Sequence, residues 1–378
     1  MRKRKSNTVL VGIRLASVLG FLYMFLVSIG LMGLAFEGFG EGFANALLTT
    51  TSNPFVGLFV GILATSIVQS SSTTTSIVVG IVGSGILTVG NAVPIIMGAN
   101  IGTTVTSMMV ALTNVTRREE FRRSIAGATV HDFFNLICVI IFFPLELMTG
   151  FLEKSAVFLA KVFVNSGGIK YTSPVKTMTA PTINFLESVL KDFFQLSGNF
   201  ASILMVLLSF VILFISLYYI VKIMKTLIMS KAETMLDNIL GTHSIWGILL
   251  GLFITIFVQS SSITVSLLVP LIAAGIVSLE LVFPIVVGAN IGTTTTAILA
   301  SFATGNISAI TIAFVHFLFN VVGTILIYPI KPIRQIPLKL AKAFGELAFR
   351  KRRYAFIYVI TTFFILPSLL ILVFRVFT

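Results

Sequence analysis

The chain has 378 residues, of which 56% are hydrophobic and only 10% charged, so polar groups cannot cover most of its surface. This composition excludes an ordinary water-soluble protein and predicts an all-α, polytopic membrane protein. The formal net charge of +13 does not indicate a nucleic-acid binder, because Lys and Arg cluster between apolar segments rather than along one surface. The single cysteine, Cys138, excludes an intramolecular disulfide.

The first unit of the chain, residues 1–148, begins with a membrane span. A span needs about 20 apolar residues to cross about 30 Å of hydrocarbon, and Leu15–Phe36 meets this requirement without a charged residue. We interpret Arg2–Lys5 as the flank of an uncleaved first span, because no small-residue cleavage site stands out after it. The further apolar segments of this unit are 55–83, 88–112 and 124–147.

The second unit, residues 200–330, follows a more polar connector at 149–199 that contains an amphipathic segment. A span at Ile203–Val221 opens this unit, as Leu15–Phe36 opens the first. Its further segments are 245–275, 281–303 and 307–330. A second amphipathic segment at 331–353 and an extra span at 354–378 complete the predicted order.

Two polar motifs occur once in each unit, 190 positions apart. Gln-Ser-Ser-Ser stands at Gln69–Ser72 and Gln259–Ser262, and Gly-Ala-Asn-Ile-Gly-Thr-Thr stands at Gly98–Thr104 and Gly288–Thr294. Their duplication argues against simple packing between membrane helices. Non-helical backbone is tolerated at membrane depth only where protein surrounds it or water fills a cavity. We therefore predict a re-entrant hairpin at each first motif, within 55–83 and 245–275. We predict a broken transmembrane helix at each second motif, within 88–112 and 281–303.

This arrangement predicts two repeats of opposite orientation. With a re-entrant hairpin, each unit crosses the membrane an odd number of times, so the second unit is inverted relative to the first. With Arg2–Lys5 in the cytoplasm, most Lys and Arg residues, including Arg117–Arg123, also lie inside, as the positive-inside rule requires. The connector 149–199 is then external, 331–353 is cytoplasmic, and the C-terminus lies outside.

The hairpin tips are predicted to bind an anion. Each Gln-Ser-Ser-Ser motif supplies an amide, three hydroxyls and the free N–H groups of a helix start. Neither unit has Lys or Arg at membrane depth, so bound cations have to neutralise a polyanionic substrate. The predicted substrate-binding residues are Gln69, Ser70, Ser71, Ser72, Gln259, Ser260, Ser261 and Ser262.

Oxygen-bearing side chains near the tips are predicted to bind Na⁺, which unwound backbone and hydroxyls coordinate in transporters. Asp132 lies inside the span 124–147 and its counterpart is Phe317, so we interpret this unpaired carboxylate as a cation ligand, with pairing to a helix terminus as the alternative. The predicted Na⁺ ligands are Asp132, Asn100, Thr103, Thr104, Asn290, Thr293, Thr294, Ser71 and Ser261.

Structural roles are predicted for the glycines of the second motif and for two His/Asn pairs. The glycines would let the helix unwind, and each His stands four residues before an Asn, which favours a hydrogen bond on one helix face. These residues are Gly98, Gly102, Gly288, Gly292, His131, Asn135, His316 and Asn320.

At these residues the chain resembles the type II sodium/phosphate cotransporter family. The likeness rests on the four motif copies and on the stretch Phe121–Asn135, with Pro144-Leu-Glu beyond it. It implies Na⁺-driven import of inorganic phosphate, chiefly divalent, through two inverted repeats that alternate access, with both Gln-Ser-Ser-Ser regions lining the substrate and Na⁺ sites. Ala126, Ala128 and Asp132 match the electrogenic members, in which the Asp contributes to an additional Na⁺ site. The connector is shorter than the cysteine-bearing external loop of animal relatives, which indicates a bacterial inner membrane protein.

Two other transport functions remain open. A Na⁺-coupled carrier of another tetrahedral oxyanion would use the same hydroxyls, whereas an uncoupled small-anion channel would not need Asp132. An enzyme with a Ser nucleophile is not expected, because no His or Asp stands next to either Gln-Ser-Ser-Ser motif as a base. The predicted partners are inorganic phosphate, Na⁺ and the lipid bilayer, with a homodimer left open and no organic cofactor.

Overall fold

The structure is a computed structural model that describes residues 2–39, 42, 45, 48–49, 51–165, 174–193, 198–239 and 244–376. Over these ranges the chain is helical without a β-strand, and seven helices are long and apolar enough to cross a membrane. They are Val11–Glu37, Val89–Leu112, Arg118–Thr149, Asn199–Met224, Leu279–Thr304, Ile307–Ile327 and Arg353–Phe374. The predicted all-α, multi-pass membrane protein is therefore confirmed.

The first half of the chain contains α1 and then a run of shorter helices. These helices are α1 (Arg2–Glu37), α3 (Pro54–Val68), α4 (Ser71–Gly83), α5 (Val89–Gly102), α6 (Thr104–Leu112), α7 (Arg118–Thr149), α8 (Phe151–Asn165) and α9 (Pro174–Ser188). The connector 149–199 is thus largely helical in its described part, and its residues 166–173 and 194–197 lie outside the described residues.

From α10 onward, the second half of the chain has a similar order of helices, with the single helix α13 in place of α5 and α6, and then a C-terminal segment. Its elements are η1 (Val189–Phe193), α10 (Gly198–Ile239), α11 (Ser244–Val258), α12 (Ser261–Ala273), α13 (Leu279–Thr304), α14 (Ile307–Ile327), α15 (Lys331–Arg350), α16 (Arg353–Ile360), η2 (Thr361–Ile365) and α17 (Leu366–Val376). The predicted location of the C-terminal residue, Thr378, lies outside the described residues.

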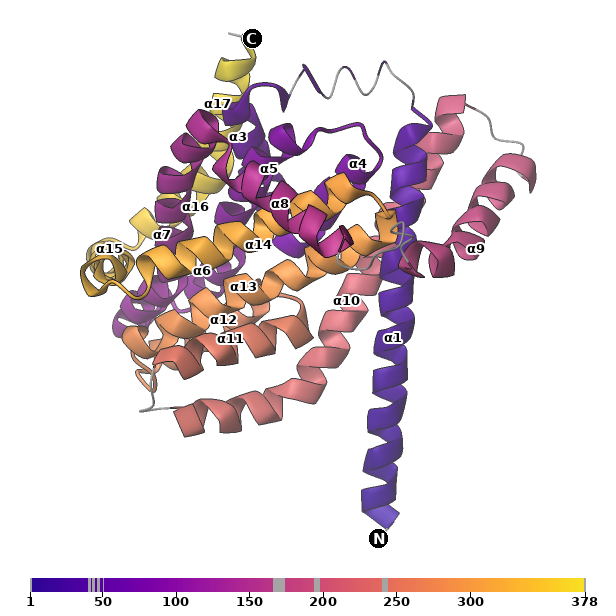
Figure 1. The fold of residues 1–378 in the computed structure, drawn as a ribbon. Helices are drawn as coiled ribbons and strands as arrows, with labels where there is room; N and C mark the ends of the chain where they lie inside the picture. Colours follow the sequence, from indigo (N-terminus) through magenta and orange to yellow (C-terminus); the bar gives the residue numbers. More distant parts are fainter. Residues whose placement is uncertain are drawn as a thin grey trace.

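The two halves pack around a shared core. Helix α1 packs along α10 on one side of the molecule, and α15, α16 and α17 lie on the other side in Figure 1. Between them, α3 packs along α5 and α11 packs along α13, while α4 contacts α13 and α12 contacts α7. The second short helix of each predicted hairpin therefore packs against the opposite half of the chain.

Glycines let the backbones of α3 and α5, and of α11 and α13, come into direct contact. A Cβ atom on Gly98 would overlap the carbonyl oxygen of Leu58, and one on Gly288 would overlap that of Ile248. Small residues allow such close approach between membrane helices. The motif glycines lie within the helices α5 (Val89–Gly102) and α13 (Leu279–Thr304) and serve helix packing there, so the structure shows no unwinding at them. The glycines concerned are Gly98, Gly102, Gly288 and Gly292.

The second copy of the predicted broken helix is continuous. Helix α13 runs from Leu279 to Thr304 without interruption, so the predicted break within 281–303 is wrong. In the first copy the interruption is limited to Thr103, between α5 and α6, and its φ of −57° and ψ of −32° remain helical. Close packing against α3 and α11 keeps these segments helical despite their Gly and Thr content.

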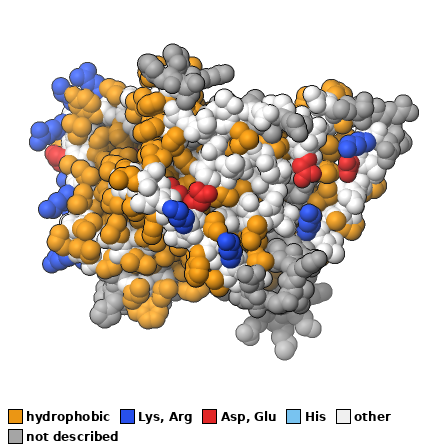
Figure 2. Space-filling view, turned by 45° about the horizontal axis from the view of Figure 1, so that its top comes forward, with side chains coloured by type: hydrophobic (Ala, Val, Ile, Leu, Met, Phe, Trp, Pro, Cys, Tyr) orange, Lys and Arg blue, Asp and Glu red, His pale blue; other side chains and the backbone are white. Residues whose placement is uncertain are grey.

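Apolar side chains also cover much of the outer surface. Figure 2 shows hydrophobic side chains over much of one half of the face in view, with Lys and Arg side chains along its edge. On α17, Leu369 and Leu372 are 54% and 61% exposed, and on α11 Phe253 is 54% exposed. Exposed apolar areas of this extent are typical of a surface that contacts lipid.

Candidate functional site

Each Gln-Ser-Ser-Ser motif forms a tight connection between two short helices. After α3 ends at Val68, Gln69 has the left-handed φ of 57°, and Ser70 is the N-cap of α4. The Ser70 Oγ accepts a hydrogen bond from the Thr73 N–H at 3.2 Å, which is the standard use of Ser at a helix start. Gln259 and Ser260 have the same conformations between α11 and α12.

The left-handed glutamines carry backbone strain. Among the described residues, Gln69 and Gln259 are the only non-glycine residues with a positive φ. This conformation costs an L-residue with a Cβ atom about 1–2 kcal/mol, and such strain is concentrated at functional sites. The two glutamines therefore mark the two motifs as the principal candidate site.

The two motifs contact each other although they are far apart in the sequence. The Ser72 hydroxyl donates a hydrogen bond to the Gln259 carbonyl at 3.0 Å. Thr106 of α6 donates to the Gln69 carbonyl at 3.3 Å, and Ser262 donates to the Thr103 carbonyl at 3.5 Å. The tips of both halves and the α5–α6 junction thus form one polar cluster.

A cavity of about 220 Å³ lies between this cluster and α10. Its volume is several times the roughly 30 Å³ that a water molecule occupies in the liquid, so a small oxyanion fits. None of its lining residues is Lys or Arg, so its polar groups are uncharged. The lining residues from the two motifs are Gln69, Ser70, Ser72, Gln259, Ser260 and Ser262, and those from α10 are Phe214, Leu217, Tyr218 and Val221.

Two predicted residues of the motifs do not line this cavity. Ser71 and Ser261 are each the first residue of a helix, α4 and α12, and their side chains are buried. The α10 residues were missed by sequence reasoning, since an aromatic residue such as Tyr218 in an apolar helix carries no motif. The only signal in the sequence was that the span Ile203–Val221, now part of α10, had no assigned role beside a predicted anion site.

The second motif takes part in a buried network of hydrogen bonds. Asn290 of α13 bonds His131 Nε2 through Oδ1 at 2.5 Å and donates through Nδ2 to Asn135 Oδ1 at 2.8 Å. Asn135 donates to the Asn100 carbonyl at 2.8 Å, and Asn320 donates to Asn100 Oδ1 at 3.2 Å. The network joins α5, α7, α13 and α14 across the two halves of the chain.

The predicted hydrogen bond between His131 and Asn135 on one helix face is wrong. The His131 side chain reaches Asn290 on another helix instead, because α13 lies beside α7. In the second half, the predicted bond within the pair is present, because the Asn320 side chain donates to the main-chain oxygen of His316 one turn earlier on α14, at 3.0 Å. The side chains of His131, Asn135 and Asn320 thus connect helices.

The two halves of this network are not equivalent. By the motif offsets, His316 corresponds to His131 and Asn100 to Asn290. Within the described residues, however, neither ring nitrogen of His316 has a hydrogen-bond partner, although the side chain is buried. Asn100 Oδ1 accepts its hydrogen bond from Asn320 instead. The His131 ring therefore takes part in the network, whereas the His316 ring does not.

The predicted Na⁺ ligands on the second motif differ in availability. The amide oxygens of Asn100 and Asn290 already accept hydrogen bonds. The hydroxyls of Thr103 and Thr293 donate to carbonyls one turn earlier, and that of Thr294 donates to the Ile291 carbonyl. The remaining member, Thr104, has a buried hydroxyl without a hydrogen-bond partner among the described residues.

Asp132 lies buried beside Thr104. Its Oδ2 accepts a hydrogen bond from the Tyr358 hydroxyl of α16, so the prediction that this carboxylate is unpaired is wrong. Its Oδ1 has no hydrogen-bond partner in the described part of the chain. Thr104 lies close enough to interact with the carboxylate, although its hydroxyl does not have hydrogen-bond geometry toward it. Asp132 Oδ1 and Thr104 Oγ1 thus offer two oxygens to a small cation.

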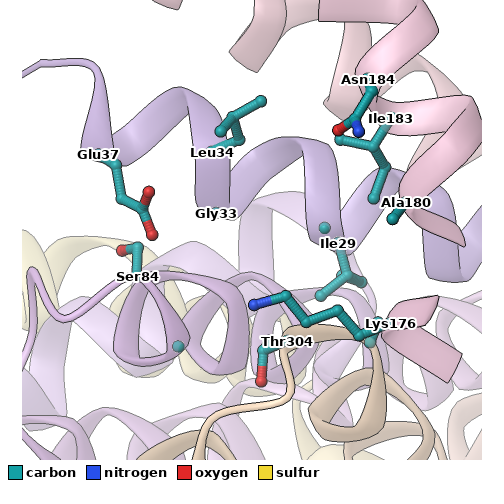
Figure 3. Close-up of a pocket in the computed structure, with 13 residues that line it drawn as sticks. Ile29, Gly33, Leu34, Glu37, Ser84, Lys176, Ala180, Ile183, Asn184 and Thr304 are labelled. Carbon is teal, nitrogen blue, oxygen red and sulfur yellow. The ribbon is translucent and has the colours of Figure 1, made fainter. Parts of the chain in front are cut away.

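A second cavity, of about 170 Å³, lies away from the motifs between α1, α4, α9 and α13. Figure 3 shows Glu37 of α1, Lys176 of α9 and Thr304 of α13 around it. No residue predicted for the site lines this cavity. Within the described residues, no cluster of three or more His, Cys, Asp or Glu side chains could hold a metal ion.

Comparison with known proteins agrees with the duplicated motifs. The family model described as Na⁺/Pi-cotransporter matches residues 24–171 and 212–344. Sodium-dependent phosphate transport protein 2B of Homo sapiens is 35% identical over 443 residues, which cover 94% of this chain and 64% of the relative. Sodium-dependent phosphate transport protein 2A of Rattus norvegicus is 35% identical over 435 residues, which cover 95% and 68%. The chain thus spans about two thirds of the length of these relatives, and no solved structure matches it.

Proposed function

The chain belongs to the Na⁺/Pi-cotransporter family, and from this premise we propose that it is a secondary transporter that imports inorganic phosphate together with Na⁺. The observation that carries the proposal is the cavity between the two Gln-Ser-Ser-Ser motifs. The Gln69 and Gln259 amides and the Ser70 and Ser260 hydroxyls line it from both halves and can donate hydrogen bonds to a tetrahedral oxyanion. Substrate-binding roles are proposed for the Gln69–Ser72 and Gln259–Ser262 motifs.

The absence of Lys and Arg from the cavity lining supports coupling to Na⁺. An anion that leaves water for such a site loses more hydration energy than neutral donors return. A divalent phosphate therefore binds together with cations that supply the opposing charge. This requirement distinguishes a coupled transporter from an uncoupled anion channel.

Asp132 and Thr104 are the proposed ligands of one Na⁺. The free Oδ1 of the carboxylate and the unpartnered hydroxyl are both oxygen donors at a buried position. Because a carboxylate adds a negative charge that a Na⁺ can neutralise, this site lets an additional cation move with the substrate. We therefore propose electrogenic transport, in which Asp132 contributes to the net charge that is moved.

Transport is proposed to proceed by alternating access between two inverted repeats. The matching helix order of the two halves and the contact between Ser72 and Gln259 support a site shared by both repeats. The proposed orientation has a cytoplasmic N-terminus, an external connector and an external C-terminus in the cell membrane. A Na⁺-coupled carrier of sulfate or arsenate is the alternative, because hydroxyls recognise any tetrahedral oxyanion.

Uptake into liposomes tests this function. Purified protein should accumulate labelled phosphate only with an inward Na⁺ gradient, and competition with sulfate and arsenate should identify the substrate. Ser72→Ala and Ser262→Ala should reduce uptake, whereas Ser84→Ala, a control at the second cavity, should not. Equal uptake when K⁺ replaces Na⁺ would refute the proposal. Asp132→Gly should abolish the stimulation of uptake by an inside-negative potential, and unchanged stimulation would refute its assigned role.

A further inference from the structure

Asp132 receives its hydrogen bond from a segment outside the region that the family model matches. That region ends at residue 344, whereas Tyr358 belongs to α16 in the C-terminal segment. The Tyr358 hydroxyl donates to Asp132 Oδ2 across 226 positions of sequence. A helix that neither repeat contains thus contacts the candidate ion ligand directly.

The Tyr358 ring is held firmly in this position. Phe344 of α15 lies 4.6 Å from it between ring centroids, Phe363 of η2 lies 6.1 Å away and Phe133 of α7 lies 6.5 Å away. A tyrosine has few rotatable bonds, and packing on several sides fixes them. The hydroxyl therefore has a defined position relative to the carboxylate.

The π-helical element η2 begins three residues after Tyr358, at Thr361. Short π-helical turns occur frequently at functional sites, where the wider turn displaces the side chains around it. Here the turn places Phe363 against the edge of the Tyr358 ring, with an interplanar angle of 88°. The local backbone of the C-terminal segment thus contributes to the position of the phenol.

A fixed phenol affects what the carboxylate can do. A buried carboxylate without donors is unfavourable, because nothing replaces its lost hydration. One hydrogen bond to Oδ2 stabilises the charge and orients the group, and it leaves Oδ1 without a hydrogen-bond partner in the described part of the chain. Pre-organised ligands bind more tightly, because less ordering remains to be done on binding.

We propose that Tyr358 is a positioning residue that orients Asp132 for Na⁺, so that the C-terminal segment helps to set the Na⁺ affinity. This inference rests on the proposed function of Asp132 as a Na⁺ ligand. Tyr358→Phe removes only the hydroxyl and keeps the aromatic packing. The Na⁺ concentration for half-maximal uptake should then rise about tenfold or more, the size expected for one hydrogen bond to a charged group.

The effect should be specific for Na⁺. The phosphate concentration for half-maximal uptake, measured at saturating Na⁺, should stay within about twofold of wild type. Tyr354→Phe is the matched control, because it removes a hydroxyl one turn earlier on α16, where the ring stacks with Arg353. This variant should have the Na⁺ dependence of the wild type.

A double-mutant cycle separates positioning from a structural role. In the Asp132→Gly background, Tyr358→Phe should cause no further change in Na⁺ dependence. Thermal stability of the purified protein in NaCl relative to KCl, without phosphate, provides a second readout. The Na⁺ concentration that gives half of this stabilisation should also rise in Tyr358→Phe. An unchanged Na⁺ midpoint in Tyr358→Phe, or an equal change in both backgrounds, would overturn the inference. Failure of wild-type uptake to require Na⁺ would instead overturn the proposed function.

Discussion

Replacing each left-handed glutamine by glycine should make the protein more stable and less active. Gln69 and Gln259 have φ values of 57° and 55°, in which a residue with a Cβ atom is strained. Glycine has no such strain, which is about 1–2 kcal/mol, but it adds about 0.5–1 kcal/mol of conformational entropy to the unfolded chain. The expected net effect is therefore a gain of about 0.5–1 kcal/mol in unfolding free energy per site.

Loss of activity should accompany this gain. Both glutamines line the cavity between the motifs, and one hydrogen bond from an amide to a charged oxyanion contributes about 1.5–3 kcal/mol. The concentration of phosphate for half-maximal uptake should thus rise about tenfold or more in Gln69→Gly. Thermal unfolding of the purified protein and uptake into liposomes measure the two effects on the same sample.

Asparagine provides the control for this experiment. It tolerates the left-handed region better than most residues and keeps an amide, so Gln69→Asn should retain more uptake than Gln69→Gly. If Gln69→Gly takes up phosphate as well as the wild type, the side chain has no role in binding. If it is destabilised by more than about 1 kcal/mol, the strain argument fails, because the glutamine side chain then stabilises the turn.

Three further substitutions test the packing and the polar network. Gly98→Ala should reduce the unfolding free energy by about 1–3 kcal/mol, because the new Cβ atom would overlap the Leu58 carbonyl. The control Gly33→Ala should not destabilise the protein, because there is open space around Gly33. Equal effects of the two variants on thermal unfolding would contradict this. His131→Leu should cost about 1–3 kcal/mol, because it leaves the Oδ1 atom of Asn290 without a hydrogen-bond partner. His316→Leu should cost less, since no ring hydrogen bond is lost, and the reverse order in thermal unfolding would show that the asymmetry is misassigned. Ser72→Ala should cost about 1 kcal/mol through loss of the hydrogen bond to the Gln259 carbonyl, which thermal unfolding measures; an unchanged unfolding free energy would show that this contact between the tips does not stabilise the protein.

The overall order of helices could be predicted because apolar length and duplicated motifs are properties of the chain itself. The spans, the pairing of Gln69–Ser72 with Gln259–Ser262 and the need for a polar site all follow from composition and repetition. The structure adds that the two motifs line one cavity together. A pattern that repeats within apolar sequence is therefore informative about where polar groups gather.

The partners of individual side chains could not be predicted in this way. Asn290 bonds His131, and Tyr358 bonds Asp132, across helices whose relative placement no periodicity specifies. The unbroken α13 illustrates a second limit, because Gly and Thr disfavour a helix only weakly and packing overrides this preference. The sequence indicated that the motif glycines have a structural role, but it could not show that this role is close packing against the backbone of a neighbouring helix.

The direct backbone contacts at Gly98 and Gly288 also have a mechanical consequence. Where two main chains touch, no side chain lies between them that could change rotamer to let one helix slide past the other. We therefore expect α3 and α5 to move together as one rigid body, and α11 and α13 to move together as another. We therefore expect the cavity to open where the two motifs contact Phe214 and Tyr218 of α10, because these contacts are made by side chains that can change rotamer. The contacts at these glycines thus predict that each helix pair moves as one rigid body.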